Sequence, residues 1–339
     1  MLFSHSMEPF ATSGSSAVSS SLFDQVFQCS GCGASEWRLD GEAVTCECGQ
    51  RWDLRDGVLS IKPTYEDAST RFYDETGGPR FVGTSFADNV QVYAATRVYL
   101  RLLEAWYPKP SGAFLDLGAG DGRVTLWALE KGFHPVVAVD ASFPALRRLS
   151  AVAQQRGLSG LITIASPIQT APVRTAAFSA IACIEVLYYL TSPANRVSVL
   201  RKIAALLAPD GSLMLSEFTR LGRALADVVA MNLDNLRRTA YQGTRLEKTT
   251  QTAVEISHPT PAELAADLRS AGLRAIDVRA LSPIPMLFQH AYTFTSYPLR
   301  PVLDNDMQAL IETLDDQASE PGALARNLVY LLTNDTSRD

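Results

Sequence analysis

Four of the five cysteines in this 339-residue chain lie in one short stretch, "CSGCGASEWRLDGEAVTCECG", residues 29–49. They form two pairs, C-x-x-C and C-x-C, separated by thirteen residues, and a glycine follows the second cysteine of each pair. Four thiolates on two tight turns are the ligand set of a structural tetrahedral zinc ion, with no position left open for water or substrate. The alternative, ordinary reduced cysteines, leaves the clustering unexplained. The spacing therefore predicts a structural Zn²⁺ site at Cys29, Cys32, Cys46 and Cys48.

The residues between the two cysteine pairs predict the secondary structure around the metal site. Asp40-Gly41 is typical of a two-residue hairpin turn between short strands, which is the layout of a zinc ribbon. The second pair is tighter than the usual C-x-x-C, so a missing ligand would be Cys46 or Cys48. Continued into "QRWDLRDGVLSIKP", the pattern resembles the small zinc-ribbon segments found beside, or fused to, methyltransferases. That resemblance implies a metal that stabilises a small module.

A glycine-rich loop lies in "GAFLDLGAGDGRVTLWALEKG", residues 112–132. The apolar run before the loop predicts a buried strand, and the residues after it predict a helix that ends at Gly132. The next stretch, "HPVVAVD", predicts a second buried strand that ends at Asp140. This βαβ unit has its glycine turn at the carboxyl end of the first strand, which is where open α/β sheets bind ligands.

Two classes of ligand compete for this loop. A dinucleotide site has the pattern G-x-G-x-x-G, whose backbone approaches a pyrophosphate. This loop reads D-x-G-x-G-x-G, with Asp116 two residues before Gly118. A carboxylate there repels a diphosphate and suits S-adenosylmethionine (SAM), which carries a sulfonium and an α-ammonium and no phosphate. Asp140 is placed to accept both ribose hydroxyls, and a Rossmann-like domain that does not bind SAM is the remaining alternative.

These motifs resemble those of the class I SAM-dependent methyltransferases, in which "LDLGAGDGR" is similar to the first motif and "VVAVDAS" to the second. The resemblance covers the chain from about residue 70 to 334 and implies an α/β fold with a Rossmann-like seven-stranded sheet. The element "RFYDE" resembles the N-terminal segment that covers the cofactor in this family. The resemblance implies a SAM site that includes Tyr73, Asp116, Gly118, Ala119, Gly120, Asp140 and Ala141.

The later strands complete the expected sheet. "LITIAS" predicts the third strand, and Ser166 or a backbone group follows it where the family often has an acidic residue for the adenine amino group. "FSAIACIEVLYYL" predicts the fourth strand, with Glu185 at its carboxyl end over the cofactor and Cys183 buried and inert. This stretch has neither the [D/N]-P-P-[Y/F] motif of amino-group methylation nor a Pro-Cys nucleophile. Strands five to seven are predicted in "LLAPDGSLMLSEF", "LRAIDVRAL" and "ARNLVYLLT".

Residues 219–257 predict an insertion at the ligand edge of the sheet, formed by a helical lid and a strand, "LEKTTQTAVEIS". With the aromatic stretch "SPIPMLFQHAYTFTSYPLRP" it could line an apolar pocket for an organic acceptor, although core packing explains the aromatics equally well. Candidate catalytic residues are His258, Glu185 and Tyr188, because an acceptor hydroxyl must lose its proton. The sulfonium is already a good leaving group, so in-line positioning and exclusion of water carry most of the expected catalysis.

These motifs divide the chain into four segments. We expect the ribbon to be a small metal-stabilised module docked on the enzyme, so that Cys32→Ser destabilises the ribbon while SAM binding survives. The segments are a disordered leader at residues 1–22, the zinc ribbon at 23–63, a helical segment covering the cofactor site at 64–110, and the methyltransferase domain at 111–339.

Composition narrows the classes of partner. The net charge is −6 and no basic stripe is visible, whereas proteins that hold a phosphate backbone usually have a basic surplus. No apolar run approaches the ~20 residues of a membrane-spanning helix. The first residues lack both the basic start and the apolar core of a secretory signal. We therefore expect a cytoplasmic protein without a membrane partner, for which nucleic acid is disfavoured but not excluded and a homodimer stays open.

The sequence thus predicts an enzyme that transfers a methyl group from SAM to oxygen or nitrogen of a small organic acceptor, in secondary metabolism. An RNA base methyltransferase that grips RNA with its ribbon is the second hypothesis. A non-catalytic SAM-binding scaffold, or a partner that activates a methyltransferase, is the third.

Overall fold

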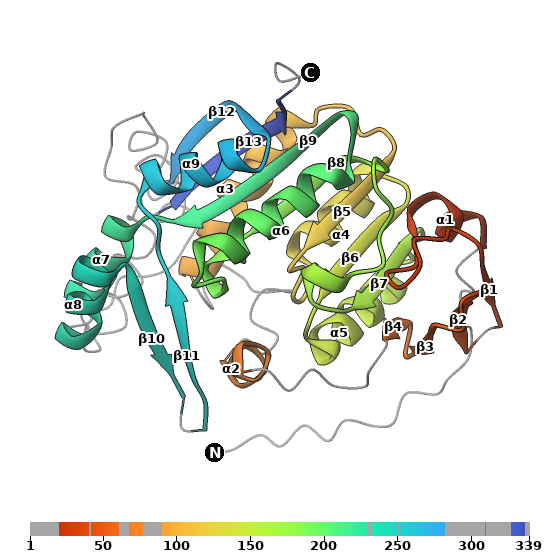
Figure 1. The fold of residues 1–339 in the computed structure, drawn as a ribbon, viewed down its shortest axis with the longest axis horizontal. Coiled ribbons are helices and arrows are strands. Elements are labelled where there is room, and N and C mark those ends of the chain that lie inside the picture. The colour runs from red at the N-terminus through yellow and green to blue at the C-terminus, as the bar shows by residue number, and fades with distance from the viewer. Residues whose placement is uncertain are drawn as a thin grey trace.

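A twisted central sheet with helices on both faces forms the body of the molecule (Figure 1). This arrangement confirms the predicted α/β class. The computed structural model describes residues 20–40, 42–60, 68–76, 90–229, 232–249, 251–281, 309 and 327–335.

Seven neighbouring strands of the sheet follow the order β7-β6-β5-β8-β9-β13-β12. Of these, β13 runs antiparallel to both β9 and β12, and the remaining neighbours pair in parallel. All seven coincide with stretches in which the sequence predicts strands. Their bounds are β5 (Ala113–Leu117), β6 (Val136–Asp140), β7 (Leu161–Ala165), β8 (Phe178–Ile184), β9 (Leu207–Phe218), β12 (Leu273–Leu281) and β13 (Asn327–Asn334).

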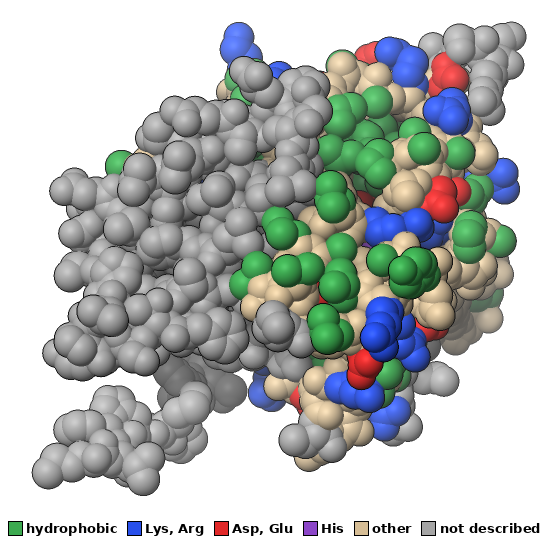
Figure 2. All heavy atoms as spheres, turned by 90° about the vertical axis from the view of Figure 1, so that its left-hand side faces the viewer, with side chains coloured by type: hydrophobic (Ala, Val, Ile, Leu, Met, Phe, Trp, Pro, Cys, Tyr) green, Lys and Arg blue, Asp and Glu red, His purple; other side chains and the backbone are tan. Residues whose placement is uncertain are grey.

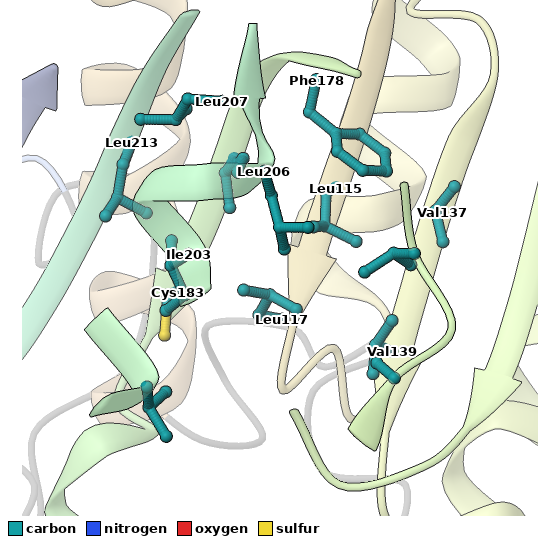
Figure 3. Packing of buried hydrophobic residues seen from close by; sticks show 14 of the residues in the cluster. Leu115, Leu117, Val137, Val139, Phe178, Cys183, Ile203, Leu206, Leu207 and Leu213 are labelled. Atoms are coloured by element: carbon teal, nitrogen blue, oxygen red, sulfur yellow. The ribbon is translucent and has the colours of Figure 1, made fainter. Parts of the chain in front are cut away.

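Alternating side chains along the strands divide the core into two layers. On β5, Phe114 packs with the helices of one face, whereas Leu115 and Leu117 pack with those of the other. Figure 3 shows the second layer, in which Ile203 and Leu206 lie against the strands. The first face is covered by α3 (Val90–Trp106), α4 (Arg123–Lys131) and α5 (Phe143–Gln155), and the second by α1 (Ser20–Val26), α6 (Pro193–Leu206) and α9 (Pro261–Ser270).

Predicted caps set several helix ends. Gly132 ends α4 in the left-handed conformation, and Ser142 accepts a hydrogen bond from the Ala145 amide at the start of α5. Thr260 and Glu263 form the complete capping box that begins α9. A capping side chain satisfies an amide that the first turn leaves unpaired, and its removal typically costs about 1 kcal/mol.

The ribbon strands continue the central sheet. An antiparallel meander of β1 (Trp37–Leu39), β2 (Ala43–Cys46), β3 (Arg51–Arg55) and β4 (Val58–Ser60) ends in a strand that pairs in parallel with β7. The isolated bridge between Phe27 and Val173 adds a second connection. Backbone hydrogen bonds therefore join the ribbon to the central sheet.

The predicted leader overlaps with ordered structure at its end. Helix α1 begins at Ser20, and Phe23 and Phe27 are buried against Trp37 and Trp52 of the ribbon. Residues 1–19 lie outside the described part of the chain. The boundary at residue 22 thus falls inside a helix that belongs to the ribbon's own core.

The insertion holds two helices and a hairpin. It comprises α7 (Arg220–Val229), α8 (Leu233–Gln242), β10 (Thr244–Lys248) and β11 (Ala253–Ser257), with the two strands paired antiparallel. The sequence predicts one strand where the chain forms two, because the turn between them contains no glycine or proline. The hairpin projects below the sheet and lies beside α2 (Ala68–Thr76) in Figure 1. The aromatic stretch at residues 282–301 lies outside the described residues.

Within the described residues, no helix is both long enough and apolar enough to cross a membrane.

Candidate functional site

A cavity of about 390 Å³ opens at the carboxyl ends of the parallel strands β5 to β8. This volume lies within the ~300–1,000 Å³ of small-molecule sites. Its position is the one expected for a ligand of an open α/β sheet. The walls are formed by residues 118–123 after β5, Asp140 and Ala141 at the end of β6, residues 166–169 after β7, and residues 184–186 and 188–190 at the end of β8.

The glycine loop lies against the cavity because its backbone is left-handed at alternate residues. The φ angles are 74° at Gly118 and 52° at Gly120, in the region that side chains rarely adopt. A Cβ at Gly118 would overlap the side chain of Val186, and one at Gly120 would overlap the hydroxyl of Tyr73. The loop therefore approaches the cavity with backbone alone, and Ala119 between these glycines also contributes to the wall.

The Asp140 carboxylate is held at the cavity by two backbone amides. Oδ2 accepts from Gly120 at 2.8 Å, and Oδ1 accepts from Ser142 at 2.7 Å. Burial, and then the neighbouring carboxylates of Asp74 and Asp121, raise the pKa of Asp140 to about 6. Each carboxylate oxygen keeps a lone pair for another donor, so this group can accept a pair of hydroxyls from a ligand.

Asp116 lies beneath the loop and does not line the cavity. Its carboxylate is 3% exposed, and Oδ2 accepts a 2.6 Å hydrogen bond from the hydroxyl of Thr125 on α4. Burial raises the pKa of Asp116 to about 6. The structure therefore places this predicted cofactor-binding residue as a support for the loop and the helix.

Glu185 brings a carboxylate to the cavity at the end of β8. Its φ of 58° is left-handed, which is unusual for a residue with a side chain. Oε1 accepts from the Tyr99 hydroxyl at 2.9 Å and from Asn327 Nδ2 at 3.1 Å. Oε2 lies 3.5 Å from Nη2 of Arg123, which also lines the cavity. The sequence predicts Glu185 at this place, but it does not reveal its three partners.

Aromatic side chains cover part of the cavity. Tyr73 reaches it from α2, and burial raises the pKa of its phenol. Tyr188 and Tyr189 lie on the wall with their ring centroids 4.4 Å apart. Burial also raises the pKa of Tyr188 well above its usual range, so its hydroxyl stays protonated near neutral pH. Ser166 also lines the cavity and donates to the Pro167 carbonyl.

His258 is fully buried and lies outside the cavity wall. Its ring packs near Tyr188 and edge-on to Phe218, and neither ring nitrogen has a hydrogen-bond partner among the described residues. Burial, followed by the charges of Arg223 and two further arginines, lowers the pKa of His258 to about 2. This location does not support the predicted role of His258 as a general base.

Comparison with known proteins identifies the family. The family described as "Methyltransferase domain" matches residues 86–278, more than half of the chain. The chain belongs to this methyltransferase family. The protein is therefore a SAM-dependent methyltransferase with a Rossmann-like fold, as the glycine loop and the carboxylate after the next strand predict.

Two similar proteins are both named ubiquinone biosynthesis O-methyltransferase. The protein from Xanthomonas axonopodis pv. citri (strain 306) is 29% identical over 174 residues, which are 51% of this chain and 67% of the relative. The protein from Xylella fastidiosa (strain 9a5c) is 30% identical over 194 residues, 56% of this chain and 72% of the relative. The PH0226 protein from Pyrococcus horikoshii OT3 shares the fold, with a TM-score of 0.51 at 14% identity, over 78% of this chain and 98% of that chain.

The methyltransferase also carries the four-cysteine centre. The four sulfur atoms lie within 4.8 Å of one another, with Cys29 and Cys48 at 3.6 Å and Cys32 and Cys46 at 3.5 Å. Zinc–sulfur bonds of about 2.3 Å in a tetrahedron place the sulfurs about 3.8 Å apart. The centre therefore fits a zinc ion, and the tight C-x-C pair brings both of its sulfurs into the set.

Tyr99, Asn327 and Arg123 are site residues that the sequence analysis misses. Arg123 follows the glycine loop directly, so its position next to the first motif was an available signal. Tyr99 comes from α3 and Asn327 from β13, separated by 228 residues, and only the folded sheet brings them together. Nothing in the local sequence around either residue indicates this convergence.

Proposed function

We propose that this enzyme transfers the methyl group of SAM to an oxygen atom of a small organic acceptor. The observation that carries the proposal is a cavity whose wall includes Asp140 and Ser166, which we assign to the nucleotide, and the aromatic pair Tyr188 and Tyr189. Oxygen is favoured over nitrogen because the similar proteins from Xanthomonas and Xylella are named O-methyltransferases.

Different residues at the cavity bind different parts of SAM. SAM supplies a methyl group on a sulfonium, which needs no metal or covalent enzyme intermediate for transfer. Asp140 accepts the ribose hydroxyls, the wall at residues 166–169 faces the adenine, and the glycine loop approaches with bare backbone. Tyr73 on α2 closes the cavity over the loop, which excludes water and fixes the attack geometry.

The acceptor proton needs no strong base in this arrangement. Tyr188 remains protonated, and His258 lies outside the wall. The Glu185 oxygens already accept from Tyr99, Asn327 and Arg123. We therefore propose an acceptor whose own hydroxyl is acidic, such as a phenol or an enol, so that it reacts as its anion. We also propose that this reaction belongs to secondary metabolism.

We propose that the four-cysteine centre holds a structural zinc ion. Every position of a tetrahedral site is filled by a cysteine, so the metal has no open position for a substrate. Retention of reduced cysteines fits a cytoplasmic enzyme. We propose the domain boundaries that the sequence predicts, with one change: the ribbon begins with α1 at residue 20.

The described residues on the side shown in Figure 2 do not favour an RNA substrate. On the side shown in Figure 2, basic side chains stand next to acidic ones, with hydrophobic side chains between them. Arg238 pairs with Glu255 within the insertion, and Arg220 pairs with Glu263 on α9, so part of the basic charge of the insertion is neutralised. A surface that binds the phosphate backbone of RNA instead keeps its Lys and Arg side chains available for the phosphates.

A transfer assay with isotopically labelled SAM tests the proposal. The enzyme would be incubated with panels of phenols, enols, amines and total RNA, and the products would be located by mass spectrometry. We expect label on the oxygen of a phenol or enol and none on RNA. Label on RNA, or on amines only, would contradict the proposed acceptor while leaving the SAM site intact.

A further inference from the structure

The side chain of Gln50 reaches the four-cysteine centre from the residue just before β3. Its Oε1 lies 3.2 Å from the sulfur of Cys29, and Cys29 is 2% exposed and packs in the core that the ribbon shares with the sheet. The other end of the amide, Nε2, lies 3.4 Å from the hydroxyl of Ser30. One side chain thus contacts both a buried sulfur of the centre and the hydroxyl next to it.

The other three sulfurs have donors from the backbone. A main-chain amide forms a hydrogen bond to each of them: Ala34 to Cys32, Cys48 to Cys46, and Gln50 to Cys48. Such bonds favour the thiolate that a metal requires, because an N–H stabilises negative charge on sulfur. At Cys29, the structure shows the side chain of Gln50 as the partner outside the cysteine set. This side chain is therefore placed to do for Cys29 what the backbone does for the others.

Gly31 leaves room for the Gln50 side chain. A Cβ built at Gly31 would lie 2.6 Å from Oε1 of Gln50, which is closer than such atoms approach. The backbone of Gly31 is not left-handed, unlike that of Gly33, so its conformation does not require a glycine. The space that a methyl group would fill is taken by the amide instead. This close approach supports the contact with Cys29 independently of the hydrogen bond.

A metal ion reverses the direction of the hydrogen bond at Cys29. The free thiol donates to Oε1 of Gln50. When zinc binds, the S–H proton is released to water and a bond from sulfur to the metal replaces it, so the sulfur can only accept. Rotation of the Gln50 amide by half a turn then presents Nε2 to the sulfur and Oε1 to Ser30. A hydroxyl both donates and accepts, so the two contacts persist with their directions exchanged.

We propose that Gln50 is a positioning residue for the zinc ion: its side-chain amide donates to the Cys29 thiolate, in the space that Gly31 leaves free. The inference rests on the zinc site of the proposed function and adds a residue outside the four ligands. Four thiolates around one Zn²⁺ leave an excess of negative charge, which each N–H directed at a sulfur reduces. Loss of a group that supports a metal ligand typically weakens metal binding by about 10- to 100-fold.

Metal titrations of the full-length protein test this role. Zinc affinity would be measured by competition with a chromophoric chelator, at one fixed pH, for the wild type and each variant. We expect Gln50→Ala to weaken zinc binding by about 10-fold or more. Gln50→Glu keeps the shape but replaces the N–H donors by a negative charge, so it should bind zinc more weakly still. Gln155→Ala removes an exposed amide at the end of α5 and should bind zinc as the wild type does.

Cobalt provides a spectroscopic signature of the hydrogen bond. Co²⁺ in a thiolate site has absorption bands that arise from charge transfer between sulfur and metal. An N–H donor withdraws electron density from the sulfur and moves these bands to higher energy. The bands should therefore shift to lower energy in Gln50→Ala and keep their position in Gln155→Ala. A loss of general stability would leave their energy unchanged.

Gly31 allows a double-mutant cycle. In the wild type, Gly31→Ala should displace the Gln50 amide and weaken zinc binding about as much as Gln50→Ala does. In the Gln50→Ala background, the same substitution should change zinc affinity by less than about twofold, because the space is then open. Equal effects in both backgrounds would show that Gly31 acts without Gln50 and would contradict the proposal.

Unchanged zinc affinity and unchanged cobalt bands in folded Gln50→Ala would overturn the proposal. If Gln50→Ala does not fold, Gln50→Glu and Gly31→Ala provide the same comparison with the wild type. A wild-type protein that binds neither zinc nor cobalt would overturn the zinc site itself and this inference with it. Neither result affects the test for oxygen methylation, because that test reads the product.

A cofactor titration shows whether the effect is confined to the metal. Affinity for S-adenosylhomocysteine, the form of SAM that remains after methyl transfer, would be measured on zinc-saturated protein. We expect the same affinity for Gln50→Ala and the wild type. A weaker affinity in zinc-saturated Gln50→Ala would indicate a general loss of structure and would contradict a role at the metal site.

Discussion

Ser60, the last residue of β4, pairs in parallel register with Ala165, the last residue of β7. The residue after Ala165 is Ser166, where the cavity wall begins. Only seven residues separate Ser60 from Ala68, the start of the helix that carries Tyr73 into the cavity. The ribbon therefore supports the strand that leads into the cavity wall, and the helix that carries Tyr73 begins a short distance further along the chain.

This pairing changes the expected effect of removing the metal. We predict that chelation of zinc, or Cys32→Ser, weakens binding of S-adenosylhomocysteine by about 5-fold or more, within the usual range of coupling between two sites. The reason is that loss of the metal loosens β3 and β4, and β4 pairs with β7, which leads into the cavity wall at Ser166. Metal content by mass spectrometry and affinity by calorimetry would be followed together.

Restoration of zinc to the chelated wild-type enzyme should recover the original affinity. Unchanged affinity in metal-free but folded protein would instead favour the docked module that the sequence predicts.

Gly120 in the glycine loop can be tested by substitution, with Gly132 at the end of α4 as the control. Both have positive φ, but a Cβ at Gly120 would meet Tyr73, whereas nothing lies within 4 Å of one at Gly132. Gly120→Ala should therefore lose nearly all binding of S-adenosylhomocysteine. Gly132→Ala should cost about 1 kcal/mol of the free energy of unfolding and leave binding unchanged. Similar affinities for both variants would show that the loop tolerates a side chain at the cavity.

Asp140 should make cofactor binding depend on pH. Its pKa is raised to about 6, and the protonated acid can no longer accept from both ribose hydroxyls. Affinity for S-adenosylhomocysteine should therefore be highest above pH 7. Below about pH 6 it should decrease, and the decrease should approach tenfold for each pH unit. Asp140→Asn should bind weakly at every pH.

Asp116 provides the control for this titration. The pKa of Asp116 is also raised to about 6, but its carboxylate lies under the loop. Asp116→Asn should retain the pH dependence of the wild type. Disappearance of that dependence in Asp116→Asn, with its persistence in Asp140→Asn, would reverse the two assignments.

His258→Leu tests whether the buried imidazole takes part in transfer. The side chain has a pKa of about 2 and no hydrogen-bond partner among the described residues, so it stays neutral at working pH. A leucine of similar volume should leave the turnover rate within about threefold and keep or raise the melting temperature, because it removes two unsatisfied polar atoms. A rate loss of 100-fold or more in folded protein would restore His258 as a catalytic residue.

Much of the fold follows from local patterns. The apolar runs around the glycine loop and the capping residues Ser142 and Thr260 each act within a few positions of the chain, so the sequence predicts the elements that they begin or end. The parallel pairing of Ser60 with Ala165 is different, because strand partners more than 100 residues apart leave no periodic signal. The insertion hairpin was missed for a local reason, since its turn lacks the usual glycine or asparagine.

The candidate site divides in the same way. Asp140 and Glu185 end predicted strands, and position alone suggests that both reach the ligand edge. The partners of Glu185 could not be predicted, since Tyr99 and Asn327 are ordinary polar residues within apolar segments. For His258 and Asp116, burial determines whether the side chain reaches the cavity. His258 and Asp116 carry reactive side chains, but the packing around them places both outside the cavity.

The helix that carries Tyr73 has consequences for engineering the acceptor range. Its Glu75 side chain accepts hydrogen bonds from Thr249 and Thr252 in the turn of the insertion hairpin. The same helix thus contacts the cavity through Tyr73 and the insertion through Glu75. A chimera that imports the insertion of another methyltransferase would have to keep these two threonines, or their equivalents, for the transplanted segment to close over the donor.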